Sequence, residues 1–225
     1  MNILAPSIAT PQRAWLAPAL LFLLGSVSVF SGFYQLYSLG QGLPANPSPD
    51  EALHYYAMPW PVALHIVCGT LFNLIAPLQF VELIRLRYSF WHRWAGRVLI
   101  ICALGAAASS LWMNHFYPAF GGTMKYLGIV AHNVVLVGSI AMSVQAILKR
   151  DVLRHRAWMM RAVAVMLSPA TQRVLIIPWV GVTGIFNDAI IATVIWCGLL
   201  INLAVVEWLL RSNKKNKKAA SASPS

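Results

Sequence analysis

Charged side chains are scarce in this sequence. Only 10% of its 225 residues are Asp, Glu, Lys or Arg, and only 6 residues are acidic, whereas 59% of the chain is hydrophobic. This composition excludes an ordinary water-soluble domain, which needs far more charge on its surface. Cysteine is also scarce. Cys68, Cys102 and Cys197 form no CxxC pair and lie in apolar runs, so we interpret them as packing residues.

The motifs of soluble enzymes are absent as well. There is no GxGxxG, P-loop, HExxH or nucleophile elbow, so nothing predicts nucleotide binding or hydrolysis. The net charge of +11 has no helix-turn-helix, zinc-finger or RNA-binding signature beside it, which argues against nucleic acid as a partner. The basic residues lie between apolar runs and at the C-terminus, where membrane topology and anionic lipid head groups explain them.

The sequence does contain a series of long apolar runs. Its mean hydropathy is +0.66, and the runs have about the length that crosses a bilayer as a helix. The six predicted spans cover residues 15–39, 60–81, 91–113, 126–149, 157–180 and 189–210. The predicted fold is all-α: a polytopic six-helix transmembrane bundle at 15–210, with a four-helix core formed by spans two to five. A cytoplasmic segment, 1–14, precedes it, and a basic tail, 211–225, predicted to be disordered, follows it.

The distribution of basic residues predicts the direction of the spans. Fourteen of them fall in the N-terminal segment, in the connections after spans two and four, and in the tail, which all lie on one side of the predicted bundle. The opposite side carries only Lys125. By the positive-inside rule, both termini lie in the cytoplasm and the chain is a multi-pass protein of the cell inner membrane.

A topology reporter tests this orientation. A reporter fused after Ser225 is expected to be active only if it is of the kind that works in the cytoplasm, because the charge distribution retains that end there. Activity of a periplasmic reporter at the same position would overturn the six-span arrangement.

Four histidines lie in the predicted core spans or directly at their start, one for each span. His65 and His132 lie roughly 7–11 Å below the outer ends of spans two and four, while His92 and His155 begin spans three and five on the cytoplasmic side. A histidine inside the bilayer is costly unless something binds it. Two imidazoles at one depth on facing helices are what a haem with two axial histidines requires. The pattern therefore predicts an outer haem b site, and an inner one at His92 and His155.

Glycine lies one helical turn from three of these histidines, at Gly69, Gly96 and Gly128. Residues four apart share a helix face, so each glycine would leave bare backbone beside a porphyrin. Glycine at this spacing also permits close helix packing without a cofactor, and a membrane histidine can simply bond across a bundle. Both interpretations stay open on the sequence alone.

Arginines supply candidate partners for an anionic group. Arg161 lies inside span five, a little above His155, and we expect it to bind a haem propionate or another anion. We interpret Arg93 and Arg97 first as charges that set the membrane topology, and second as partners for haem propionates. Arg173 is also intramembrane, and the sequence assigns it no role.

Three segments carry a family resemblance. These are LHIVCGTLFNLIAPLQF at 64–80, RLRYSFWHRWAGR at 85–97 and RHRAWMMRAVAVMLSPATQR at 154–173. They resemble the bacterial membrane-protein family catalogued as domain of unknown function 2306, which implies the fold and location but no activity. The histidine layout is also similar to that of two-haem cytochromes of the b-561 type, in which helices two and four hold one haem and three and five the other. This resemblance implies the pairs His65 with His132 and His92 with His155.

Two functions are consistent with these patterns. The first is a b-type cytochrome-like electron-transfer protein, a membrane oxidoreductase that takes electrons from a quinol or another small donor and passes them to a partner. The second is a haem-free helical bundle that binds a small molecule or metal, or that assists assembly of a membrane complex. The visible spectrum of the purified protein separates the two.

Overall fold

The computed structural model of the protein describes residues 11–43, 53–118 and 121–222, and these ranges contain helices and no strand. The long helices are α1 (Pro11–Gly40), α3 (Trp60–Ile75), α5 (Ser89–Phe116), α6 (Gly122–Leu148), α7 (Val152–Thr183) and α8 (Asp188–Ala222). The short ones are α2 (His54–Ala57), η1 (Ala76–Phe80) and α4 (Glu82–Arg87). Six helices are long and apolar enough to cross a membrane, which confirms the predicted number of spans.

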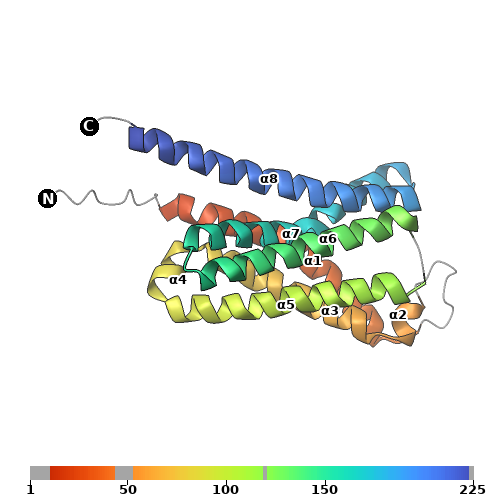
Figure 1. The fold of residues 1–225 in the computed structure, drawn as a ribbon. Coiled ribbons are helices and arrows are strands. Elements are labelled where there is room, and N and C mark those ends of the chain that lie inside the picture. The colour runs from red at the N-terminus through yellow and green to blue at the C-terminus, as the bar shows by residue number, and fades with distance from the viewer. Residues whose placement is uncertain (1–10, 44–52, 119–120, 223–225) are drawn as a thin grey trace.

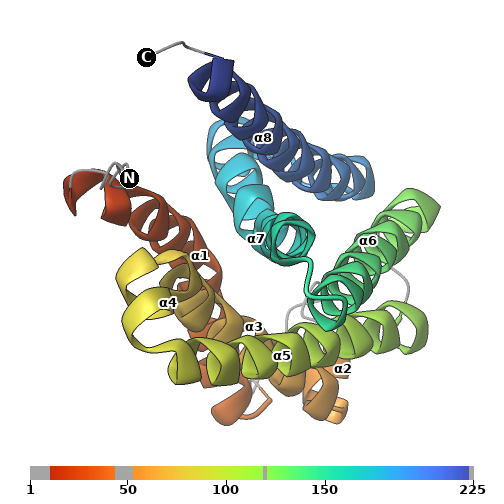
Figure 2. The same cartoon turned by 60° about the vertical axis from the view of Figure 1, so that its left-hand side comes forward.

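The four-helix core predicted from spans two to five is confirmed. Helices α3, α5, α6 and α7 pack in that order, and each supplies a side chain at most 1% exposed to the centre: Phe72, Leu99, Leu136 and Val165. Helix α1 packs outside α3 and α7, and α8 outside α6 and α7 (Figure 2). Helix α7 therefore contacts both flanking helices as well as the core.

The ends of α7 show why a helix interrupted by two arginines still forms one long element. Its first turn is capped by Asp151, whose carboxylate accepts a hydrogen bond from the backbone N–H of Arg154 at 2.9 Å. At the other end Gly184 adopts a left-handed conformation, with φ of 65°, that terminates the helix. Both signals are local, and they determine where α7 begins and ends although Arg161 and Arg173 interrupt its apolar sequence.

Basic connections and chain ends share one end of the bundle. Helix α4, which carries Arg85 and Arg87, lies at the same end as the start of α1 and the end of α8, while α2 lies at the opposite end (Figure 1). The segregation of charge along the sequence is therefore also a segregation in space.

The outer surface of the bundle is strongly apolar. No more than a third of the most apolar window of any span is buried in the bundle, and large side chains such as Phe30, Ile101 and Val182 are 74%, 68% and 87% exposed. Water would penalise such a surface, whereas hydrocarbon does not, and the helices satisfy their own backbone groups. The exposed apolar surface fits a bilayer as the surrounding solvent.

Two segments differ from their expected backbone. The tail, predicted to be disordered from residue 211, continues α8 as helix to Ala222. Lysine and alanine favour helix, and neither Gly nor Pro occurs between 211 and 222, so nothing stops the helix from extending. The connection after span two also contains a helix, α4, and Pro77 lies in a 3₁₀ turn, η1, where its missing N–H disrupts fewer bonds.

Candidate functional site

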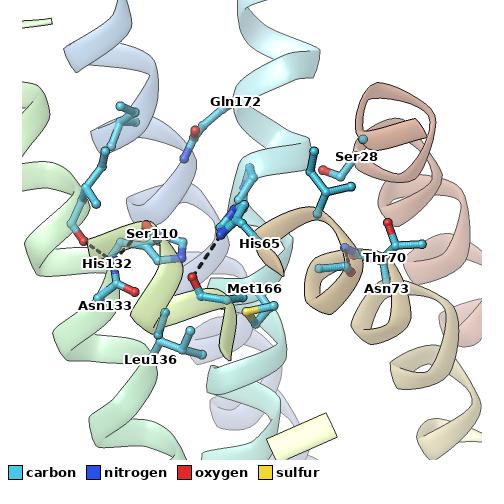
Figure 3. Close-up of a pocket in the computed structure, with 18 of the residues that line it drawn as sticks. Ser28, His65, Thr70, Asn73, Ser110, His132, Asn133, Leu136, Met166 and Gln172 are labelled. Atoms are coloured by element: carbon cyan, nitrogen blue, oxygen red, sulfur yellow. Dashed lines mark hydrogen bonds between the residues drawn. The ribbon is translucent and has the colours of Figure 1, made fainter. Parts of the chain in front are cut away.

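A cavity of about 270 Å³ lies within the bundle, bordered by the core helices and by α1 and α8. His65 from α3 and His132 from α6 both line it, and their imidazoles reach towards one another from opposite sides (Figure 3). Gln172 enters from α7 (Figure 3). The histidine pair that the sequence matches by depth thus lines one shared space.

The imidazole of His65 is held through its Nδ1 atom. Nδ1 donates to the carbonyl of Ala106 on α5 at 3.0 Å, and the hydroxyl of Ser109 lies 3.3 Å away. A carbonyl can only accept, so the proton of the neutral ring belongs on Nδ1 and Nε2 carries a lone pair. The Ser109 hydroxyl donates to the Gly105 carbonyl at 2.8 Å and leaves this assignment unchanged.

Proline in α7 fixes the imidazole of His132 in the same way. Pro169 has no N–H, so the carbonyl of Val165 four residues earlier loses its usual helical donor. The hydroxyl of Ser168 donates to that carbonyl instead, at 2.8 Å. Its lone pair then accepts the Nδ1 proton of His132, 3.0 Å away, and again Nε2 carries a lone pair.

The two imidazoles therefore share one tautomer and one arrangement. Each is bonded at Nδ1, and neither Nε2 has a hydrogen-bond partner within the described part of the chain. Metal-ligating histidines are typically bonded in this manner, because a second partner at the far nitrogen fixes the ring and raises the basicity of the ligating atom. Each ring thus keeps one nitrogen with a lone pair, which is the atom that a histidine ligand uses.

Only one of the two outer glycines borders the cavity. Gly69 lines it, and a Cβ built there would meet no atom within 4 Å, so the space beside His65 is open. Gly128 was predicted to border the same gap, but a Cβ there would lie 2.8 Å from Ile195 and 3.2 Å from the Trp196 indole of α8. We therefore correct the role of Gly128: it allows α6 and α8 to pack closely.

The inner histidines have a less complete site. Nδ1 of His155 donates to the Ser143 carbonyl at 3.1 Å and lies 2.8 Å from the Ser143 hydroxyl. His92 lies close enough to His155 to interact with it electrostatically, but its buried Nδ1 has no hydrogen-bond partner among the described residues. A Cβ built at Gly96 would meet no atom within 4 Å, but this glycine does not line the cavity of about 270 Å³.

One of the three arginines expected near the inner site, Arg161, already has a carboxylate partner within the bundle. Arg161 forms a two-pronged ion pair with Glu207 of α8, through Nε to Oε1 and through Nη2 to Oε2 at 3.1 Å, and its guanidinium lies 4.4 Å from the centre of the Trp158 ring. This corrects the predicted propionate contact, because the fork is already occupied. Arg93 and Arg97 are exposed.

The histidines outside the predicted pairs, His54 and His115, lie at the end of the bundle opposite α4 (Figure 1). His54 packs against the rings of Tyr55 and Tyr117, with ring centres 4.2 and 4.7 Å away, and burial, aided by Lys125, lowers the pKa of its imidazole. His115 packs edge-on against Phe116. Neither residue lines the cavity.

Several polar residues of the site were not assigned roles from the sequence. Ser109 and Ser168 contact the imidazoles of the two histidines at Nδ1. Arg173 lines the cavity together with the two histidines. A serine directly before a proline within an apolar helix is a signal that would identify Ser168, since the proline leaves a carbonyl in need of a donor. An intramembrane arginine such as Arg173 is a signal by itself.

Comparison with known proteins gives one match. A family model described as "Predicted membrane protein (DUF2306)" matches residues 62–210, which contain both histidine pairs and most of the cavity lining. No curated protein and no solved structure matches the chain. Because the match covers well over half of the chain and agrees with the six apolar helices, this protein belongs to the membrane-protein family catalogued as domain of unknown function 2306.

Proposed function

We propose that this protein is a b-type cytochrome-like electron carrier of the cell inner membrane, with His65 and His132 as the two axial ligands of a haem. One observation carries the proposal: both rings are fixed at Nδ1 and present to the same cavity an Nε2 that no described residue engages. Free imidazole nitrogens in pairs at one depth are costly in a membrane protein unless they bind something.

The residues around the pair fit a flat macrocycle. Gly69 leaves open space one turn from His65, and the core wall next to it is built from small side chains, Ala106 and Ala107. A bound haem supplies one-electron redox chemistry, which no side chain of this cavity can provide. The protein would hold the two ligand rings in a fixed orientation and set the basicity of both ligating nitrogens through their Nδ1 partners.

The same proposal extends to an inner haem at His92 and His155. His155 has the fixed tautomer of the outer ligands, and Nδ1 of His92 is a buried polar atom that lacks a hydrogen-bond partner among the described residues. The proposed donor is a quinol or another small reductant, which would make the protein a membrane oxidoreductase.

The visible spectrum of detergent-purified protein from haem-supplied cells tests the proposal. We expect a Soret band and sharp α-bands on reduction, because two imidazole ligands give a low-spin iron centre. A colourless and well-folded protein would refute the cytochrome function.

A second candidate is a haem-free pocket for a small polar molecule. The polar lining of the cavity supports it: Thr70, Asn133 and Gln172 all border the space between the helices. Hydroxyl and amide groups of this kind fix the orientation of a small polar ligand. The colourless outcome of the same spectrum would favour this candidate.

Replacing Ser168 tests how His132 is positioned. Ser168→Ala removes the acceptor of the Nδ1 proton, so we expect haem affinity to fall by about 10- to 100-fold while the α-helix content stays the same. Haem titration of the haem-free protein measures the affinity, and circular dichroism measures the helix content. Ser168→Thr retains the hydroxyl and serves as the matched control. Equal affinity in Ser168→Ala and the wild type would show that this bond does not position the ligand.

A further inference from the structure

Arg173 in the second half of α7 brings a positive charge into the cavity that the described residues leave unneutralised. It lines the same cavity as His65 and His132 and is half-buried. Its one hydrogen bond joins Nη1 to the Pro169 carbonyl, one turn earlier in its own helix, at 2.9 Å. A guanidinium has five N–H donors in a planar fork, so most of the fork remains available to a molecule in the cavity.

The described carboxylates all have partners elsewhere. The contacts are Glu82 with Arg85, Glu207 with Arg161, Asp151 with the N–H of Arg154, and Asp188 with the N–H of Gly121. The remaining two acidic residues of the chain, Asp50 and Glu51, lie outside the described residues. Within the described chain, no carboxylate lies at ion-pair distance from Arg173.

We propose that Arg173 is an anion-binding residue of this cavity and pairs with a carboxylate of the bound molecule. An arginine within a membrane bundle is costly and marks a binding site by default, and its fork matches a carboxylate through two parallel hydrogen bonds. The imidazoles of the cavity carry no negative charge in any protonation state found at ordinary pH, so they leave this charge uncompensated. The carboxylate has two sources: a haem propionate, in which case the inference rests on the proposed function, or a free organic acid.

The first test separates a binding role from a structural one. In haem-free protein, Arg173→Gln removes an uncompensated charge from the bundle, so we expect the melting temperature to rise, by about 2 °C or more. Arg173→Lys keeps the charge and should give no such rise. A melting temperature that falls in Arg173→Gln would show that the guanidinium holds the fold together, and would overturn the proposal.

The second test identifies a propionate as the source. Haem-free wild-type protein is titrated with hemin and with hemin dimethyl ester, which lacks free propionates. We expect hemin to bind about tenfold or more tightly than the ester, and this preference to disappear in Arg173→Gln. Arg87→Gln, an exposed arginine of α4 away from the cavity, is the matched control and should keep the preference.

The third test identifies a free acid as the source. Benzoate, a carboxylate small enough for the cavity, should raise the melting temperature of the haem-free wild type but not of Arg173→Gln, and neutral benzamide should raise neither. If benzoate stabilises the wild type and the wild type binds hemin and its ester equally well, the carboxylate that pairs with Arg173 belongs to a free acid. If neither carboxylate depends on Arg173, the proposal is wrong. If the wild type binds no hemin, the proposed function fails, and the benzoate titration alone decides the role of Arg173.

Discussion

His65→Ala and His132→Ala are each expected to abolish the same share of bound haem. Both imidazoles line one cavity, and Nε2 of each is free of described partners, so the loss of either ligand destroys one shared site. With an inner site also occupied, each variant should lose about half of the haem of the wild type, and the double variant should lose no more than either single one. The haem content per protein, measured by the pyridine haemochrome spectrum, reports this directly.

The controls separate ligand loss from misfolding. His54→Ala and His115→Ala remove histidines that do not line the cavity and should leave the haem content unchanged. Adding free imidazole to His65→Gly should restore the spectrum, since the ring that was removed leaves space for it beside Gly69. A haem content that stays at the wild-type value in both His65→Ala and His132→Ala would show that no haem is held by this pair.

Glu207→Leu is expected to destabilise the protein by about 3 kcal/mol, the second large effect. The substitution leaves Arg161 in a bundle without the carboxylate that accepts both of its hydrogen bonds, and an unpaired charge there is costlier than no charge at all. The free energy of unfolding in a graded detergent titration measures the loss. Contact between α7 and α8 should weaken first, because the pair joins these two helices.

A double variant tests whether the ion pair is the cause. Arg161→Leu/Glu207→Leu removes both charges and should recover most of the stability lost in Glu207→Leu. Glu82→Leu is the matched control: its pair with Arg85 is more exposed, with side chains 63% and 39% accessible against 37% and 22% for Glu207 and Arg161, so its loss should be small. A double variant as unstable as Glu207→Leu would assign the effect to lost packing.

Most of the fold follows from the sequence because the bilayer imposes a simple rule on it. A helix must run for about twenty apolar residues to satisfy its backbone in hydrocarbon, so run lengths alone indicate the six spans. The sequence patterns did not predict the helix α4 or the helical tail. No bilayer constrains the chain in these two segments, so local helix propensity decides their backbone conformation.

Depth in the membrane is also encoded in the sequence. A helix rises about 1.5 Å per residue, so the distance of a histidine from the end of its span fixes its depth. This is why the sequence alone pairs His65 with His132, and why the two residues line the same cavity. The family motifs around His65, His92 and His155 likewise predicted the membership that the family match confirms.

The direction in which each residue points is decided by the tertiary structure. In a soluble helix, an apolar stripe marks the core face, but in a membrane helix both the lipid face and the core face are apolar, so the sequence carries little record of rotation. Gly128 therefore packs against α8 instead of the cavity, and Arg161 points to Glu207, 46 residues away in the chain. Arg173 and Ser168 join the site for the same reason: only the packing of α7 against α6 and the core decides which of its faces meets the histidines.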